Sequence, residues 1–219
     1  MNITISLYRS ETSNKSGIYK DYKVPFSHGM TVLDVCLYVY QHLDATFAFR
    51  YECRQGICGT CGVMLNQRPV LSCQTRINPR VNNTISPLAN FPVEKDLIID
   101  LVPVLEKFIK VKPYLDKIQE VRITKLKANE SKPYRKCVEC GCCIAGSDTM
   151  GKNIDDLLDP MSLVKIARFV TDPRDGANRK KLLANSNLDS YSPEELQRLT
   201  NLCPRGVPID KALELLKRN

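Results

Sequence analysis

The stretch Cys53-Arg-Gln-Gly-Ile-Cys58-Gly-Thr-Cys61, completed by Cys73, decides the fold of this 219-residue chain. Four residues separate the first two cysteines, two separate the next pair, and eleven precede Cys73. This is the ligand spacing of a plant-type [2Fe–2S] cluster, which four cysteine thiolates hold. Glycines interleave the ligands, where backbone N–H groups must approach the cluster sulfurs closely. The spacing therefore predicts a [2Fe–2S] cluster on Cys53, Cys58, Cys61 and Cys73.

A second cysteine group follows in the last third of the chain. Two residues separate Cys137 from Cys140 and Cys140 from Cys143, and a Cys-Pro pair stands far downstream at Cys203. Three ligands in one loop and a remote Cys-Pro are typical of bacterial ferredoxins. We therefore expect a [4Fe–4S] cluster on these four cysteines. Cys142 falls between the ligands and is not expected to bind iron.

Zinc is the alternative occupant of both groups. Zinc knuckles favour two C-x2-C pairs, and in the first group only Cys58 and Cys61 fit that spacing. Disulfides are disfavoured because the N-terminus, MNITISLYRS, has no secretory signal pattern and the cytosol keeps thiols reduced. No apolar run approaches the roughly 18 residues of a membrane span. We expect a cytoplasmic protein that can lie peripherally on the cytoplasmic membrane face.

Hydrophobic periodicity divides the chain into a β-rich part and a helical part. Alternating Ile3, Ile5 and Leu7 predict a half-buried strand, and a capping box from Thr31 to Asp34 predicts a helix to about residue 43. A short hairpin is expected between the third and fourth cysteines. We predict an α+β protein, with an N-terminal β-grasp plant-type ferredoxin domain over 1–103 and an all-helical bacterial-ferredoxin-like domain over 104–219. Helices are expected over 104–111, 114–121, 161–170, 192–202 and 208–218.

The net charge of +8 is concentrated in one segment. Residues 106–136 contain ten Lys/Arg against four acids. Aromatic residues do not alternate with the basic ones, as they do on a single-strand nucleic-acid platform. This segment indicates a docking surface or a solvated helix face, with anionic lipid next and nucleic acid last.

The residues around the cysteines closely resemble one family, the iron–sulfur subunits of succinate dehydrogenase and fumarate reductase. The resemblance rests on the first motif with GVMLN after Cys61 and RPVLS before Cys73. It continues through residues 91–100 (FPVEKDLIID) and 109–115 (IKVKPYL), which are similar to the family's bridge between domains. The second cysteine group, with RGVP after the Cys-Pro pair, is similar to its second domain.

The resemblance implies a multi-subunit enzyme. A separate FAD-bearing subunit would interconvert succinate and fumarate. This chain would relay electrons between that subunit and a quinone or other redox partner. No catalytic residue is expected in this chain, because His28 and His42 are remote in sequence from both cysteine groups.

The sequence departs from the family at the third, [3Fe–4S], cluster. The family places its three ligands at the positions of Ser147, Pro193 and Leu199. Proline and leucine side chains have no donor atom, so we predict that this cluster is absent. The exit for electrons is then either a membrane quinone-binding subunit or a further soluble redox subunit of thiol/disulfide type. The same relay serving a different flavoprotein is the alternative function.

Overall fold

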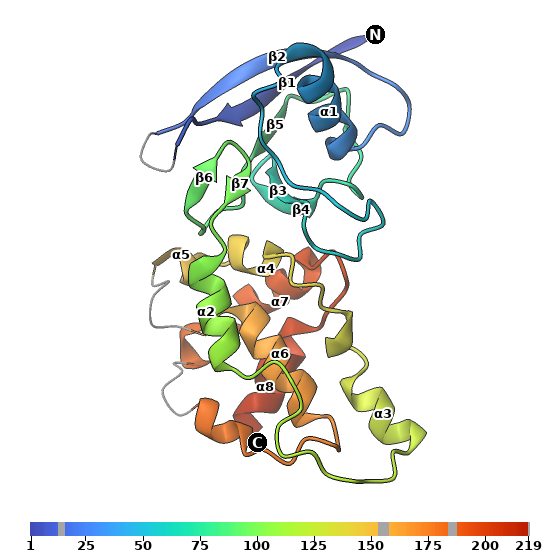
Figure 1. Ribbon diagram of the computed structural model, residues 1–219, viewed down its shortest axis with the longest axis vertical. Helices are drawn as coiled ribbons and strands as arrows, with labels where there is room; N and C mark the ends of the chain where they lie inside the picture. The colour runs from blue at the N-terminus through green and yellow to red at the C-terminus, as the bar shows by residue number, and fades with distance from the viewer. Residues whose placement is uncertain (13–15, 153–157, 184–187, 219) are drawn as a thin grey trace. The chain divides into compact units, whose positions relative to one another are not determined.

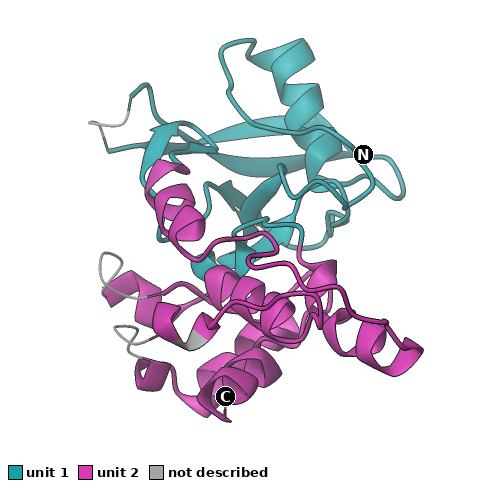
Figure 2. Ribbon diagram, turned by 60° about the horizontal axis from the view of Figure 1, so that its bottom comes forward, with its two compact units in different colours: residues 1–100, 138–146 teal, residues 101–137, 147–219 magenta. Residues whose placement is uncertain are grey.

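The computed structural model describes residues 1–12, 16–152, 158–183 and 188–218 (Figure 1). The chain forms two compact units, which Figure 2 distinguishes by colour. The first contains residues 1–100 and 138–146, and the second contains residues 101–137 and 147–219. The second cysteine loop therefore packs with the N-terminal unit although it follows the first helix of the other unit in sequence.

A five-stranded mixed sheet forms the first unit, in the order β2-β1-β5-β3-β4. Strand β1 pairs antiparallel with β2 and parallel with the central strand β5. Strands β1 and β2 form one antiparallel hairpin, and β3 and β4 form the hairpin that is expected between the third and fourth cysteines. The strands are β1 (Asn2–Arg9), β2 (Ile18–Pro25), β3 (Gly62–Leu65), β4 (Arg68–Leu71) and β5 (Asn83–Ser86), with a separate ladder of β6 (Val93–Lys95) and β7 (Ile98–Ile99).

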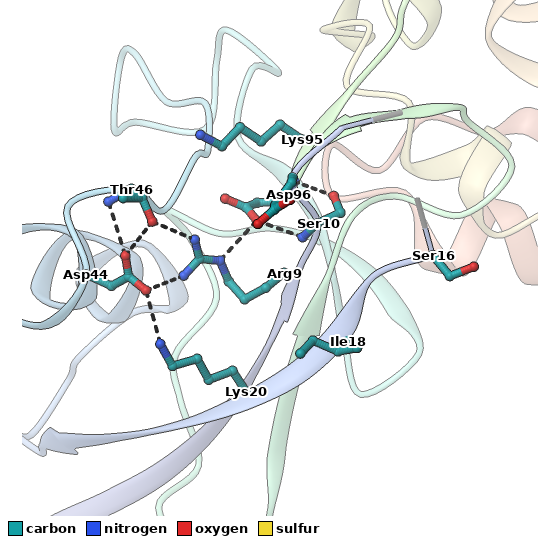
Figure 3. A pocket seen from close by; sticks show the side chains of 10 residues that line it. Arg9, Ser10, Ser16, Ile18, Lys20, Asp44, Thr46, Lys95 and Asp96 are labelled. Carbon is teal, nitrogen blue, oxygen red and sulfur yellow. Dashed lines mark hydrogen bonds and ion pairs between the residues drawn. The ribbon is translucent and has the colours of Figure 1, made fainter. Parts of the chain in front are cut away.

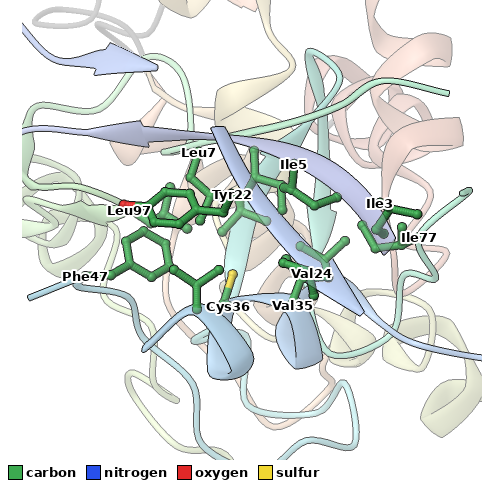
Figure 4. Close-up of a cluster of buried hydrophobic side chains, with 14 residues drawn as sticks. Ile3, Ile5, Leu7, Tyr22, Val24, Val35, Cys36, Phe47, Ile77 and Leu97 are labelled. Carbon is green, nitrogen blue, oxygen red and sulfur yellow. The ribbon is translucent and has the colours of Figure 1, made fainter. Parts of the chain in front are cut away.

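One helix covers the core face of this sheet (Figure 4). Helix α1 (Val32–Tyr38) begins at the predicted capping box, in which Thr31 Oγ1 accepts from the Asp34 N–H and the Asp34 carboxylate accepts from the Thr31 N–H. It continues as a π-helical turn, η1 (Val39–Leu43). The alternating side chains of β1 enter the core as expected, and Cys36 on α1 is buried among them. Burial raises the pKa of the Cys36 thiol to about 12.

The second unit is helical around α6 (Pro160–Val170), nearly all of whose side chains are buried. Asp159 caps this helix by accepting from the Ser162 N–H at 2.9 Å. Helix α6 packs against α8, which also packs against α7, and Lys165 lies over the ring of Phe108 from α2. The other helices are α2 (Val102–Lys110), α3 (Lys125–Ser131), α5 (Asp148–Lys152), α7 (Pro193–Leu202) and α8 (Ile209–Arg218), with 3-10 turns η2 (Tyr134–Lys136), η3 (Arg179–Leu182) and η4 (Leu188–Ser190).

The predicted helix over 114–121 is wrong. The buried guanidinium of Arg179 donates to the carbonyls of Lys112 and Tyr114 at 2.8 and 2.7 Å. The Gln119 N–H donates to the Arg174 carbonyl at 2.9 Å. Because these backbone groups bond to a loop some 60 residues downstream, they are not engaged in a helix.

The architecture confirms the predicted α+β class, with a β-grasp sheet followed by helices. The domain limits 1–103 and 104–219 stay a prediction. The compact units differ from those limits because residues 138–146 pack beside the first cysteine loop.

Candidate functional site

The β3–β4 hairpin brings two predicted ligands of the first cluster together. Cys61 directly precedes β3 and Cys73 follows β4 after one residue. Their sulfur atoms lie 3.4 Å apart, and the Ser72 N–H donates to the Cys61 carbonyl at 3.0 Å. Both side chains are buried. Burial raises the pKa of the Cys61 thiol to about 11.

The other two predicted ligands form a second pair in the preceding loop. The Cys53 thiol has a hydrogen bond with Cys58 and accepts from the Gln55 N–H at 3.4 Å. The backbone N–H groups of Gln55 and Ile57 lower the pKa of the Cys53 thiol to about 6. This half of the site thus favours the thiolate, which is the form that binds metal.

Two pairs of thiols fit a two-iron cluster, in which each iron takes two protein ligands. Among the residues that the structure describes, no three His, Cys, Asp or Glu side chains gather as the ligands of a single metal ion do. The buried Cys61 and Cys73 would lose their protons on binding iron, because a coordinating thiol is deprotonated.

A glycine lets the second cysteine loop reach the first. Gly59 has a φ of +76°, and a Cβ on it would lie 2.1 Å from the Val138 carbonyl oxygen. As a result Cys140 packs against the buried residues Leu33, Cys61, Leu71 and Cys73. One predicted ligand of the second cluster is therefore in contact with the pocket of the first, within a single compact unit.

The remaining ligands predicted for the second cluster belong to both units. Cys143 lies in α4 (Cys142–Ala145) of the first unit, whereas Cys137 and Cys203 belong to the second. Cys203 directly follows α7, and its sulfur accepts from the Val207 N–H at 3.4 Å. Cys142 is fully buried inside the first unit, as a small apolar side chain.

The three positions of the family's third cluster are filled by ordinary packing in the second unit. Leu199 is fully buried, and Pro193 is the first residue of α7. Ser147 Oγ donates to the Glu195 carboxylate at 2.6 Å, and the Thr149 N–H donates to the same oxygen at 3.1 Å. The Thr149 hydroxyl donates to the other carboxylate oxygen at 2.5 Å.

Sequence reasoning missed the role of Glu195. The Ser-Pro-Glu-Glu pattern predicts a capping box at α7, and Ser192 Oγ does accept from the Glu195 N–H at 3.2 Å. The carboxylate does not return to Ser192 but bonds to Ser147 and Thr149 instead. No signal in the local pattern identifies partners that lie 46 and 48 residues away in the chain.

Two histidines and a cavity lie apart from the cysteine loops. His28 and His42 are exposed. A cavity of about 610 Å³ lies at the end of β1, but Arg9 on its wall is already bonded to Asp44 and Asp96 at 2.5 and 3.0 Å (Figure 3). No helix of the described residues is long and apolar enough to cross a membrane.

Comparisons with known proteins agree with this geometry. Residues 2–106 match the model of a 2Fe-2S iron-sulfur cluster binding domain. The fumarate reductase iron-sulfur subunit of Haemophilus influenzae is 30% identical over 94% of this chain and 88% of its own length. An uncharacterized iron-sulfur protein of Methanococcus maripaludis is 30% identical over 94% of this chain but only 42% of its own length. A chain of the Mycobacterium smegmatis Sdh1 complex in the apo form matches with a TM-score of 0.90 and 26% identity, over 99% of this chain and 94% of that chain.

Proposed function

Because the chain belongs to the family of fumarate reductase and succinate dehydrogenase iron–sulfur subunits, we propose that it relays electrons between an FAD subunit and a second redox partner. Cys53, Cys58, Cys61 and Cys73 hold a [2Fe–2S] cluster, and Cys137, Cys140, Cys143 and Cys203 hold a [4Fe–4S] cluster. When bound, these clusters accept and release single electrons at potentials that the protein tunes. The chemistry of succinate and fumarate resides on the FAD subunit.

The packing of Cys140 against Cys61 and Cys73 carries this proposal. Electron transfer between two centres needs them to be close, and a shared apolar wall keeps their ligands in contact. Gly59 makes the contact possible, because any side chain there would push the Val138–Cys140 backbone away. The two cysteine loops therefore pack together across the limit between the proposed domains. The domains we propose remain 1–103 and 104–219.

The electron path ends at the second cluster. A cluster at Ser147, Pro193 and Leu199 would have no thiolate, and it would displace a bonded carboxylate and a buried leucine. The loss of these contacts would leave buried donors unsatisfied. We propose that the [3Fe–4S] cluster is absent, and that the partner takes electrons from the [4Fe–4S] site.

The segment 101–126 offers a docking surface for that partner. Val102, Leu105 and Ile109 share one face of α2 and are 57, 47 and 68% exposed, and farther along Ile118 and Leu126 are 72 and 79% exposed. Exposed apolar residues in this number mark an interface, and lysines interleave them. We propose a redox subunit with an acidic docking face and a soluble rather than membrane-embedded site.

Spectroscopy of the purified complex tests the proposal. Chemical analysis should give about six iron and six acid-labile sulfide atoms per chain, two and four from the respective clusters. Electron paramagnetic resonance should show both centres after reduction and no [3Fe–4S] signal in the oxidised sample. Cys203→Ala should remove the second signal and spare the first, and Cys58→Ala should remove the first. A colourless zinc protein would refute the relay, and a [3Fe–4S] signal would refute the proposed exit.

A further inference from the structure

Gln74, directly after the last ligand of the first cluster, closes over the ligand loop. Its Nε2 donates to the Arg54 carbonyl at 3.3 Å and to the Cys73 carbonyl at 3.1 Å. The same nitrogen lies 3.5 Å from the Cys73 sulfur, so one of its two N–H groups is shared between the Cys73 carbonyl and a Cys73 thiolate. The Gln74 amide thus links the loop that contains Arg54 to Cys73, and it approaches one of the four sulfur ligands.

Two features of the backbone position this amide. The Gln74 N–H donates to the Leu71 carbonyl at 3.0 Å, which fixes the residue at the end of β4. Opposite it, Gly56 has a φ of +70°, and a Cβ there would lie 2.8 Å from the Gln74 Cγ. The absence of a side chain at Gly56 therefore makes room for the glutamine stem.

The donor to Cys53 is of a different kind. Cys53 accepts from the main chain, through the N–H of Gln55. A main-chain donor belongs to the loop fold and is retained whatever the side chain. The Gln74 amide is a side-chain donor, so a single substitution removes it without removing a backbone bond.

We propose that Gln74 is a positioning residue that raises the reduction potential of the [2Fe–2S] cluster by donating to the Cys73 sulfur. Reduction adds one electron from the redox partner to the cluster, and part of its charge resides on the ligand sulfurs. No proton moves and no bond breaks. An N–H donor stabilises the more negative, reduced form more than the oxidised form, and hydrogen bonds to the sulfurs are among the factors that set the potential. This inference rests on the proposed [2Fe–2S] assignment.

A graded series tests it on the holoprotein. Gln74→Met keeps the length of the side chain and removes the donor, and Gln74→Glu removes the donor and adds a negative charge. The reduction of the first cluster is followed by electron paramagnetic resonance in a dithionite titration. Gln74→Met should lower the equilibrium constant for this reduction about three- to tenfold, where tenfold equals a potential lower by about 59 mV for one electron. Gln74→Glu should weaken it further. The potential of the second cluster should change less than that of the first.

Gln41→Met is the matched control, because it makes the same change at another exposed glutamine, which lies outside the cysteine loops. In this control variant the reduction potential of the first cluster should equal that of the wild-type protein. An unchanged potential in Gln74→Met, with full iron content, would overturn the proposal and leave Gln74 a structural bridge. If the wild-type protein has no [2Fe–2S] signal, the cluster assignment itself fails. That result is distinct from an unchanged potential.

Discussion

Replacing Glu195 with leucine should destabilise the region around Ser147 and Leu199, which occupy ligand positions of the family's third cluster. The carboxylate accepts from the Ser147 hydroxyl, the Thr149 N–H and the Thr149 hydroxyl. The Thr149 hydroxyl keeps a second acceptor, the Ser190 carbonyl at 3.3 Å, so the Ser147 hydroxyl and the Thr149 N–H are the two donors that lose their bond to the carboxylate. Each unsatisfied buried donor costs about 1–3 kcal/mol, so the local cost is on the order of 3 kcal/mol. Glu195→Gln retains an acceptor oxygen and should cost about 1 kcal/mol.

Hydrogen exchange measured by mass spectrometry resolves this local effect. About 3 kcal/mol corresponds to a roughly hundredfold larger opening constant in peptides from α5 and α7, and peptides from β1 and β2 serve as the internal reference. Glu194→Leu is the control, because Glu194 is exposed on the same turn of the same helix. Equal exchange in the Glu195→Leu and Glu194→Leu proteins would refute the reasoning, because the carboxylate network would then hold nothing in place.

Three further changes probe the rest of the molecule. The Thr46 hydroxyl, with help from Arg9, holds the pKa of Asp44 well below its usual range, so its stabilisation of the first unit is present above the unfolded pKa of about 3.9 and is lost as the pH falls. Asp44→Asn should cost ~1 kcal/mol at neutral pH after solvent screening and flatten the acid side of a melting-temperature profile; an unchanged profile would contradict this. Gly59→Ala should force the second cysteine loop away and reduce iron from about six to about two atoms per chain, and full iron content would show that the contact is dispensable. Arg179→Met removes the ion partner of the buried Asp175 carboxylate and a donor to three backbone carbonyls; we expect a loss of about 3–5 kcal/mol in urea unfolding and new proteolysis in residues 111–121, and resistance to protease would argue against it.

The parts of the fold that sequence predicted correctly depend on local chemistry. The capping box at Thr31 and the Asp159-Pro160 start of α6 involve partners within three residues, so the pattern contains all of the interacting groups. The alternation along β1 identifies its buried face for the same reason, since the period of a strand is two. The apolar runs 63–65 and 69–71, separated by Asn66-Gln67-Arg68, likewise predicted a hairpin between Cys61 and Cys73, which the structure contains.

The failures have a common physical cause in distant partners. The segment 114–121 has a helical pattern, but its carbonyls bond to Arg179, which lies 65 residues beyond Tyr114. Glu195 has the right position for a capping box, but stronger donors reach it from Ser147 and Thr149. The docking of residues 138–146 with the first unit was also not predictable, because the requirement for it appears only when the space beside Gly59 is known.

If the third cluster is absent, as we propose, the packing at its ligand positions explains how the neighbouring helix α7 stays fixed. Helix α7 begins at Pro193 and ends directly before Cys203, so the geometry of a predicted [4Fe–4S] ligand depends on how this helix is held. If thiolate ligands were merely missing at positions 193 and 199, the space of the cluster would be an empty cavity. Cavities in a packed interior cost stability. Leu199 fills the core side of the helix, and Glu195 fastens its first turn to α5. Protein contacts therefore fix helix α7 on its core side and at its first turn. The Cys203 sulfur after its end stays available to the proposed second cluster.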